Sequence, residues 1–192
     1  DKTYINHEDL TKPFLVVNIK SGVSYYKVGL LLIRGVKYQK RKIVDSLGNA
    51  ERISGSIIGE STYSSLIKLL TSYASAEESV EDSYRGDNRA VDMTVSDIYG
   101  GGIDSLGLPK DIIASSFGKA RYLDKKSVED KDIARSVITM VCLNIAQLTT
   151  MISDLEKLDQ IVILGGMLSQ AVFQQILAVT LFFCGMISNT ML

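Results

Sequence analysis

Continuous hydrophobic runs near both ends of the chain predict buried strands. Residues 14–19 (FLVVNI) are rich in branched side chains, which is typical of a central strand buried on both faces. A tight turn at 20–24 leads to a second predicted strand at 25–33, and alternating basic residues predict a third, more exposed strand at 38–44. Together these strands predict an antiparallel meander. Residues 160–166 form another apolar run that ends in glycines, which predicts a further central strand.

Apolar residues at helical spacing predict most of the other elements. We expect helices at 64–73 and 174–183, and a longer amphipathic helix at 133–152. The apolar face of this long helix carries one polar residue, Asn144, which we interpret as packed and hydrogen-bonded rather than catalytic. The face itself serves either a dimer interface or the core of the chain.

The middle of the chain has a weaker pattern. Residues 76–84 are acidic and polar and predict a solvated connector or helix. Val91, Val95 and Ile98 recur at the spacing of one helix face, so a short helix is predicted there. It should end at Gly100–Gly102, because glycine permits backbone angles that other residues avoid.

Composition places the chain among ordinary globular proteins. Its 192 residues are 46% hydrophobic and 22% charged, enough for one domain with a sizeable core. A formal net charge of -1 gives no reason to expect nucleic acid or an anionic membrane as partner. Cys142 and Cys184 lie in apolar runs without metal-like spacing, so we expect no metal site but buried free thiols in a reducing compartment.

Targeting signals do not stand out. The first residues lack the basic and apolar segments of a secretory signal, and we expect a cytoplasmic protein. Residues 161–192 contain no charged residue, and a run of this length is long enough to be considered as a membrane span. Gly165–Gly166 and three glutamines interrupt that run, so a buried strand, a turn and a packed helix explain it better, and no membrane partner is expected.

Four motifs follow one another in the middle of the sequence. Residues 86–92 read GDNRAVD, 97–102 read DIYGGG, 107–109 read GLP, and 113–119 read IASSFGK. Their order resembles that of the eukaryotic-type pantothenate kinases, and the resemblance covers about residues 13–185. It implies an α/β domain of the actin-like ATPase and sugar-kinase superfamily, which is ribonuclease-H-like. The whole chain, 1–192, would be the C-terminal lobe of such a kinase, with the N-terminal lobe outside this sequence.

The resemblance gives the turn after the first strand a mechanical meaning. In the family a hairpin with the pattern NIGSGVS grips phosphate with backbone amides, and residues 18–24 here read NIKSGVS. Lys20 replaces a glycine that lets backbone approach phosphate closely. Its ammonium either supplies charge to a phosphate or occupies space that the nucleotide needs, and we favour the second interpretation.

A second phosphate-facing loop has also changed. Gly55, Ser56 and Gly59 match the family's glycine loop, but Glu60 and Ser61 replace two of its consecutive glycines. A carboxylate at a phosphate-facing helix start would repel the nucleotide; the alternative is a helix-start acid that faces solvent. The resemblance thus implies a degenerate ATP site made of Lys20, Gly22, Gly55, Ser56, Gly59, Gly165 and Gly166.

The substrate side is better preserved. In the family, two hairpin serines and an arginine contact pantothenate, and they match Ser21, Ser24 and Arg52. Arginine pairs well with carboxylates, and hydroxyls both donate and accept hydrogen bonds. The family's dimer also places residues of one protomer against the other's pocket, and the matching positions here are Val23, Tyr99 and Ala114.

Two functions follow from the resemblance. The first is that of a divergent pantothenate kinase subunit, which uses ATP and Mg²⁺ to phosphorylate the 4′-hydroxyl of pantothenate in coenzyme A synthesis. The family's general-base glutamate is not identifiable, since Glu8 has no motif around it. The second is a pseudokinase subunit that dimerises with an active paralogue and completes its pocket. The partner is accordingly a second copy or a paralogous kinase.

Overall fold

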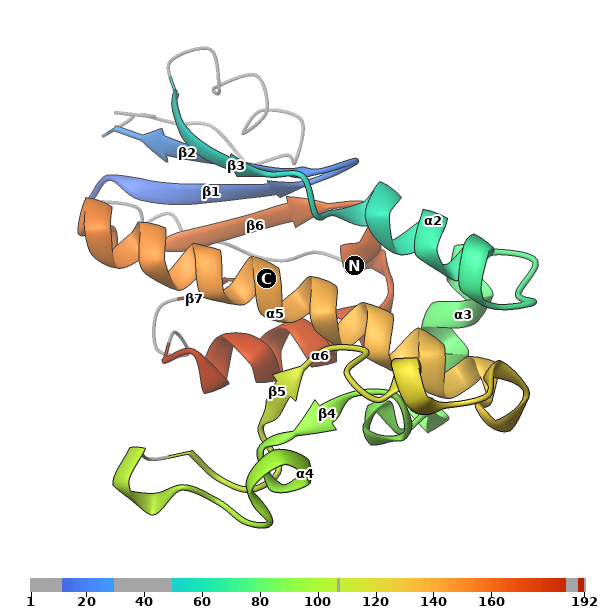
Figure 1. Ribbon diagram of the computed structural model, residues 1–192. Helices are drawn as coiled ribbons and strands as arrows, with labels where there is room; N and C mark the ends of the chain where they lie inside the picture. The colour runs from blue at the N-terminus through green and yellow to red at the C-terminus, as the bar shows by residue number, and fades with distance from the viewer. Residues whose placement is uncertain (1–11, 30–49, 107, 186–189, 192) are drawn as a thin grey trace. The chain divides into compact units, whose positions relative to one another are not determined.

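The chain divides into two compact units, each described here by itself. A computed structural model describes residues 12–29, 50–106, 108–185 and 190–191 (Figure 1). The first of the two units, which we call the sheet unit, combines residues 1–62 with 143–192. The second, the motif unit, comprises residues 63–142. Two helices run from one unit into the other, α2 (Glu60–Leu70) and α5 (Asp130–Glu156).

A five-stranded mixed sheet forms the core of the sheet unit. Its strand order is β3-β2-β1-β6-β7. The strands are β1 (Phe14–Ile19), β2 (Val23–Val28), β3 (Glu51–Ser56), β6 (Ile161–Gly165) and β7 (Thr190–Met191). β2 is antiparallel to both β1 and β3, whereas β6 is parallel to β1 and to β7. β2 therefore runs against the other four strands.

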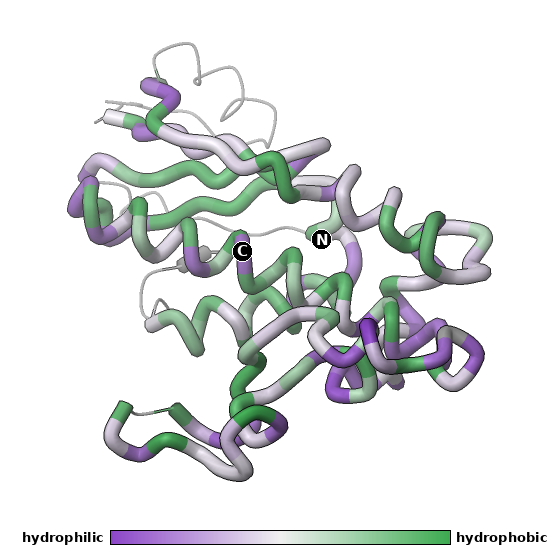
Figure 2. Tube along the Cα trace, in the orientation of Figure 1, coloured by the Kyte–Doolittle hydropathy of each residue, from purple (hydrophilic) through white to green (hydrophobic). Residues whose placement is uncertain are grey.

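The central strand β1 is buried on both faces, as its continuous apolar run predicts. Phe14 and Val16 join Val28 and Val162 in a hydrophobic cluster on one face. On the other face the second half of α5 lies against the sheet, where the Tyr25 hydroxyl donates to the Ile145 carbonyl oxygen over 3.5 Å. Figure 2 shows β1 and β6 as continuous hydrophobic segments. The predicted strands at 14–19 and 160–166 are confirmed.

The meander is present, but with strands other than those predicted. β2 begins at Val23, two residues before the predicted start, and the predicted third strand at 38–44 lies outside the described residues. The third strand of the sheet is β3, in a segment that we interpreted as loop. Its sequence, ERISGS, has small and charged residues and no hydrophobic alternation, so pairing with β2 rather than local propensity makes it a strand.

Helices of the sheet unit follow the predicted types with shifted bounds. α2 begins four residues before the predicted start at 64, α5 extends beyond 133–152 at both ends, and α6 (Ala171–Phe183) begins three residues early. A short 3₁₀ helix, η7 (Met167–Ser169), separates β6 from α6. The uncharged C-terminal stretch is therefore strand, turn and helix as far as residue 185.

Among the residues that the structure describes, one helix is long and apolar enough to span a membrane by length and composition alone. This is α5, with 27 residues, and half of its most apolar window is buried inside the protein. Buried core helices of ordinary globular domains have the same length and composition. The apolar helix α6 has only 13 residues.

The motif unit consists of short elements. Its helices and strands are α3 (Ala76–Asp82), β4 (Met93–Thr94), α4 (Val95–Tyr99) and β5 (Ile113–Ser115), with β4 antiparallel to β5. The 3₁₀ helices are η2 (Ser83–Arg85), η3 (Asn88–Ala90), η4 (Asp104–Leu106), η5 (Ala120–Tyr122) and η6 (Lys125–Ser127).

The predicted short helix of this unit is partly correct. α4 starts at Val95, so Val91 precedes it, and Ile98 is 49% exposed rather than on a buried face. The predicted glycine stop is confirmed, because Gly100 ends the helix with φ 75°. Cys142 is buried and Cys184 half-buried, and both are free thiols.

Strand β6 ends in Gly165, a position where the sheet has no room for a larger residue. A Cβ at Gly165 would lie 2.7 Å from the Ile19 carbonyl oxygen and 2.9 Å from the Ile19 Cβ on β1. We expect Gly165→Ala to lower the free energy of unfolding by about 1–3 kcal/mol, because neither strand can move away without breaking the ladder. Chemical denaturation monitored by circular dichroism measures this loss.

Gly29 provides the matched control. A Cβ at Gly29 meets nothing within 4 Å, so Gly29→Ala should leave the unfolding free energy within about 0.5 kcal/mol of the wild type. Equal unfolding midpoints for the two alanine variants would contradict the close approach of β6 to β1.

Candidate functional site

Three segments of the sheet unit come together where β1, β3 and β6 end. Ile19 is in register with Val23 and with Gly165, and Val23 is in register with Ser56. The turn at 20–22, the loop at 56–59 and the glycine pair at 165–166 therefore share one edge of the sheet. These are the segments that the sequence predicted to face phosphate and nucleotide.

The turn and the loop touch through their backbones. A Cβ at Gly22 would lie 2.5 Å from the Ser56 carbonyl oxygen, and a Cβ at Gly59 would lie 2.7 Å from the Cα and the carbonyl carbon of Gly22. Within the turn, the Lys20 amide donates to the Gly22 carbonyl oxygen over 2.8 Å. Only glycine fits at both positions, so the two motifs form one packed corner.

Three consecutive backbone amides in this corner donate to acceptors within the chain. The Ile58 amide donates to Ser56 Oγ over 3.1 Å and the Gly59 amide to Thr62 Oγ1 over 3.2 Å. The Glu60 amide, the first of α2, donates to the Lys20 carbonyl oxygen over 2.7 Å. Amides at a glycine loop and helix start are the groups that usually bind phosphate. Here protein acceptors engage them.

The Glu60 side chain also faces this corner. A Cβ at Gly166 would lie 3.2 Å and 3.4 Å from the two carboxylate oxygens of Glu60. The residue is half-buried, and the alternative of a helix-start acid that faces solvent stays a prediction. Its negative charge lies between the start of α2 and the end of β6. Lys20 is exposed, and its backbone contacts Gly22 and Glu60.

Asn144 anchors the loop to α5. The Ser56 hydroxyl donates to Asn144 Oδ1 over 3.0 Å while it accepts from the Ile58 amide. Asn144 is half-buried, and its predicted role as a packed, hydrogen-bonded residue is confirmed. Sequence reasoning missed Thr62, whose hydroxyl accepts from Gly59 and donates to the Ile57 carbonyl oxygen over 3.0 Å. Its position in the first turn of a helix is the signal that could have revealed it.

The expected substrate residues lie on the hairpin and on β3. Ser21 is exposed in the turn, Ser24 is half-buried on β2, and Arg52 is exposed on β3. Ser24 is in register with Gly55, and a Cβ at Gly55 would collide with the Arg52 guanidinium. Because paired residues point to the same face of a sheet, Ser24 and the Arg52 guanidinium share one face. The structure thus brings together a hydroxyl and a cation suited to a carboxylate.

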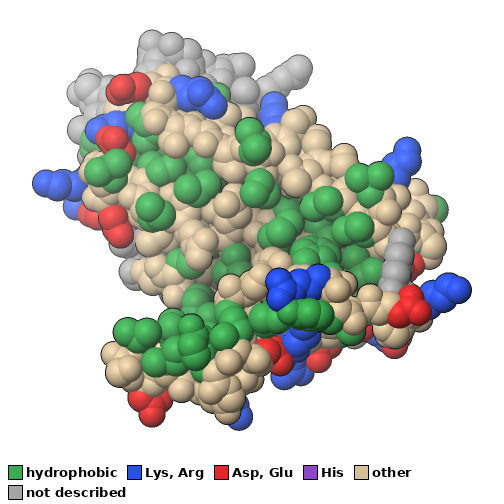
Figure 3. All heavy atoms as spheres, in the orientation of Figure 1, with side chains coloured by type: hydrophobic (Ala, Val, Ile, Leu, Met, Phe, Trp, Pro, Cys, Tyr) green, Lys and Arg blue, Asp and Glu red, His purple; other side chains and the backbone are tan. Residues whose placement is uncertain are grey.

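The residues expected to reach a partner differ in exposure. Val23 belongs to the sheet unit, where its side chain is buried and 2% exposed. Tyr99 and Ala114 belong to the motif unit, and both are exposed, Tyr99 to 65%. In Figure 3 hydrophobic side chains gather over α4 and the segment that follows it; the exposed ones include Ile98 and Leu106. The exposed part of the predicted set is therefore in the motif unit.

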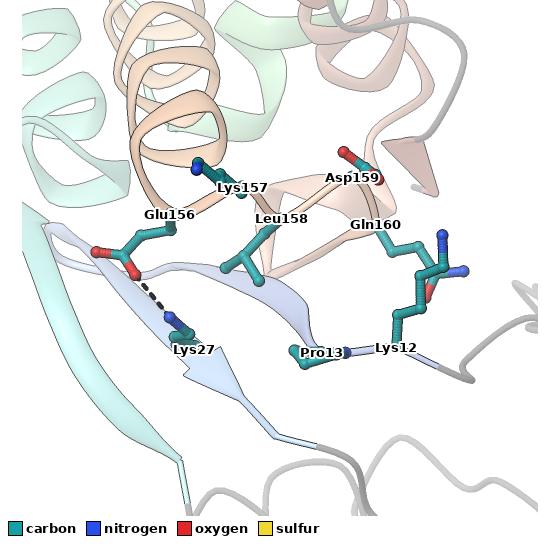
Figure 4. A pocket seen from close by; sticks show the side chains of 8 residues that line it. All are labelled: Lys12, Pro13, Lys27, Glu156, Lys157, Leu158, Asp159 and Gln160. Atoms are coloured by element: carbon teal, nitrogen blue, oxygen red, sulfur yellow. Dashed lines mark hydrogen bonds and ion pairs between the residues drawn. The ribbon is translucent and has the colours of Figure 1, made fainter.

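A separate cavity of about 240 Å³ lies at the opposite ends of β1 and β6. It is lined by Lys12, Pro13, Lys27 and residues 156–160 (Figure 4). Lys27 Nζ and Glu156 Oε2 form an ion pair across it at 2.8 Å, and this hydrogen bond raises the pKa of the Lys27 ammonium. None of the predicted site residues lines the cavity.

The described residues do not form a metal site of their own. Among them, no group of three or more His, Cys, Asp or Glu side chains is placed to hold an ion. Mg²⁺, the expected ion, commonly binds through substrate phosphates with only one or two carboxylates.

An ion pair fixes the short helix that carries Tyr99. Thr94 and Asp97 form a capping box at the start of α4, and Asp97 Oδ2 lies 2.9 Å from Lys119 Nζ. The Lys119 ammonium, followed by hydrogen bonds from Thr94, lowers the pKa of the Asp97 carboxyl to about 2. Lys119 also donates to the Arg89 carbonyl oxygen over 2.9 Å, so it joins α4 to the preceding motif.

Comparison with known proteins gives consistent matches. The model of the family described as Fumble matches residues 2–185. Pantothenate kinase 1 of Arabidopsis thaliana is 45% identical over 148 residues, 75% of this chain and 34% of that protein. Pantothenate kinase 2 of Oryza sativa subsp. japonica is 40% identical over 149 residues, 76% of this chain and 14% of that protein.

A mouse relative has a different name. The 4'-phosphopantetheine phosphatase of Mus musculus is 36% identical over 156 residues, 81% of this chain and 17% of that protein. The chain therefore spans about a third or less of the length of these three relatives.

The Asp97–Lys119 pair predicts a specific pH dependence of stability. Because the pKa of Asp97 is lowered in the fold to about 2, its stabilising effect is present above the unfolded value near 3.8 and is lost as the pH falls toward about 2. Asp97→Asn should therefore lower the thermal midpoint at neutral pH, and the gap to the wild type should close between about pH 4 and pH 2.

A double-mutant cycle with Lys119→Met tests the cause. If Lys119 lowers the pKa, Asp97→Asn should cost less stability in the Lys119→Met background than in the wild type. A difference in thermal midpoint between the wild type and Asp97→Asn that stays constant down to about pH 2 would contradict the lowered pKa of Asp97.

Proposed function

The chain belongs to the Fumble family of pantothenate kinases, and we propose that it is the C-terminal lobe of a divergent kinase subunit. The reaction is transfer of the γ-phosphate of ATP to the 4′-hydroxyl of pantothenate, the first step of coenzyme A synthesis. In this proposal the N-terminal lobe supplies the first phosphate loop and the general base, because no such glutamate is identifiable in this sequence.

The sheet topology supports the fold part of this proposal. The order β3-β2-β1-β6-β7, with β2 alone reversed, is the arrangement that we expect of a ribonuclease-H-like domain in the actin-like superfamily. In such a domain the hairpin between the first two strands approaches the phosphates. The corner formed by Gly22 and Gly59 occupies that place here.

The observation that carries the substrate part is the shared face of Ser24 and Arg52. A guanidinium binds a carboxylate with two parallel hydrogen bonds, which a lysine cannot reproduce. We assign Arg52 to the carboxylate of pantothenate and the hydroxyls of Ser21 and Ser24 to its polar groups. Mg²⁺, bound through the ATP phosphates, would neutralise charge that develops during phosphoryl transfer.

A second candidate function is that of a pseudokinase subunit, which dimerises with an active paralogue. The arrangement of Ile58, Gly59 and Glu60 favours this function, because their backbone amides already donate to acceptors within the protein. The Glu60 carboxylate also adds negative charge beside Gly166. The exposed Tyr99 and Ala114 would complete the partner's pocket. The mouse relative also illustrates that a domain of this family occurs in a protein named for another reaction.

The charge on Glu60 makes a testable difference to nucleotide binding. Glu60→Gln keeps the length of the side chain but removes the repulsion of phosphate, so we expect ATP·Mg²⁺ to bind about tenfold more tightly. Combining Glu60→Gly with Lys20→Gly should increase affinity further, because backbone can then approach the phosphates. Isothermal titration calorimetry measures both changes.

Glu51→Gln is the matched control for this series. Glu51 is an exposed acid at the other end of β3, and its neutralisation should leave the ATP affinity within about twofold of the wild type. Unchanged affinity in both the Glu60→Gln and the double-glycine variants would overturn our interpretation of the corner as degenerate.

Assays of the protein alone and in a mixture separate the two candidate functions. When its N-terminal lobe is present, a kinase subunit should phosphorylate pantothenate without a partner kinase, measured as transfer of ³²P from ATP. A pseudokinase should be inactive alone but alter the activity of an active pantothenate kinase of the same organism when the two are mixed.

The pocket assignment predicts which variant abolishes the effect in the mixture. Tyr99→Ala should remove it, whereas Tyr122→Ala, which changes another exposed tyrosine of the motif unit, should not. Activity of the protein alone rules out the pseudokinase, and loss of the effect with both tyrosine variants rules out a specific role for Tyr99.

A further inference from the structure

Asp92 is a fully buried carboxylate in the motif unit. Its side chain is 0% exposed. Oδ2 accepts from Asn88 Nδ2 over 2.8 Å, and Oδ1 accepts from the Phe117 backbone amide over 2.8 Å. The hydroxyl of Ser136 donates to the same Oδ1. Three segments that are distant in the sequence therefore meet at one side chain.

The hydrogen bonds account for a carboxyl group at this position. All three partners can donate, and the oxygens of the side chain accept. Within the described part of the chain, Asp92 forms no ion pair, so neutral donors provide its stabilisation. A buried carboxylate is tolerated when such donors satisfy its oxygens, and the low local polarity strengthens each bond. Removing the acceptor would leave the Phe117 amide without its partner.

The Phe117 amide belongs to a turn with little freedom. Phe117 has φ 58°, in the left-handed region that non-glycine residues rarely adopt. The Gly118 amide donates to the Ser115 carbonyl oxygen over 3.1 Å. A Cβ at Gly118 would lie 2.6 Å from the Met93 Cβ, so the turn packs directly against β4. Asp92 adjoins Met93 and thus holds the turn to the strand that it contacts.

We infer that Asp92 is a positioning residue that fixes the turn at 115–118 and, through it, the exposed edge that carries Ala114. Met93 is in register with Ser115, so the position of the turn determines how Ala114 is presented on β5. Asp92 itself is fully buried, so its effect on substrate is indirect. The effect on substrate rests on the proposed function, in which Ala114 borders a partner's pocket, whereas the effect on the turn does not.

Two variants of Asp92 separate the effect of losing the hydrogen-bond acceptor from the effect of changing the side-chain volume. Asp92→Leu keeps a similar volume but has no acceptor. Asp92→Asn keeps one acceptor oxygen for Phe117, and its amide group can donate to Asn88 if the Asn88 amide turns. The control is Asp87→Asn, which makes the same chemical change at an exposed acid of the same motif.

Hydrogen exchange measured by mass spectrometry tests the turn directly. In Asp92→Leu we expect the peptide covering 113–119 to exchange about tenfold faster, while exchange in α3 is unchanged. Asp92→Asn should restore most of the protection, and Asp87→Asn should leave it at the wild-type level. Unchanged exchange at 113–119, or equal loosening of α3, would overturn the inference.

Kinetics in the complete protein, or in its mixture with an active kinase, test the consequence for substrate. Asp92→Leu should raise the KM for pantothenate about tenfold with kcat within about twofold, because the edge affects binding rather than phosphoryl transfer. A fall in kcat at unchanged KM would contradict it. If the wild type has no activity and no effect on a partner, the proposed function fails, while the exchange experiment still decides the role of Asp92.

A milder variant is available if Asp92→Leu does not fold. Ser136→Ala removes one donor and leaves the Phe117 amide bonded to the carboxylate. Exchange at 113–119 should then increase by less than about threefold, with the increase confined to that peptide. An increase spread over the whole motif unit would count against a local role.

Discussion

The sheet unit depends on a backbone contact between two glycines. Gly22, at the end of the β1–β2 turn, and Gly59, just before α2, approach so closely that a methyl group at either would collide with main-chain atoms. This contact allows the Glu60 amide to donate to the Lys20 carbonyl oxygen. It therefore joins the edge of the sheet to the start of α2. It adds to the pairing of β2 with β3, which brings the loop after β3 to the hairpin.

The same contact limits what the corner can bind. A phosphate site needs backbone amides that point at the ligand, and a helix start usually provides them. Here the amides of Ile58, Gly59 and Glu60 already have protein acceptors. A nucleotide would have to replace these bonds and also tolerate the Glu60 carboxylate beside Gly166. Compact packing of the corner and phosphate binding thus compete for the same groups.

Sequence patterns predicted the elements whose signal is local. The runs in β1 and β6 are continuous and apolar, and the hairpin between β1 and β2 has a tight-turn sequence, so their types and approximate places were predictable. β3 was missed because ERISGS has no apolar alternation and becomes a strand through pairing with β2. The role of Asp92 was also invisible, because its donors come from residues that lie up to 44 positions away.

The motif unit carries the four motifs that resemble the family, but it does not discriminate between the two candidate functions. Asp92 accepts from the Phe117 amide, and Gly118 packs against Met93 in the same turn, so folding alone is enough to explain why such residues occur together. An active subunit and an inactive one would both need them. In the proposed function, Lys20 and Glu60 distinguish catalysis from partnership, because a change there alters the approach to phosphate without removing a core contact. Similarity along the chain shows the family, and the choice between the two proposals rests on this corner.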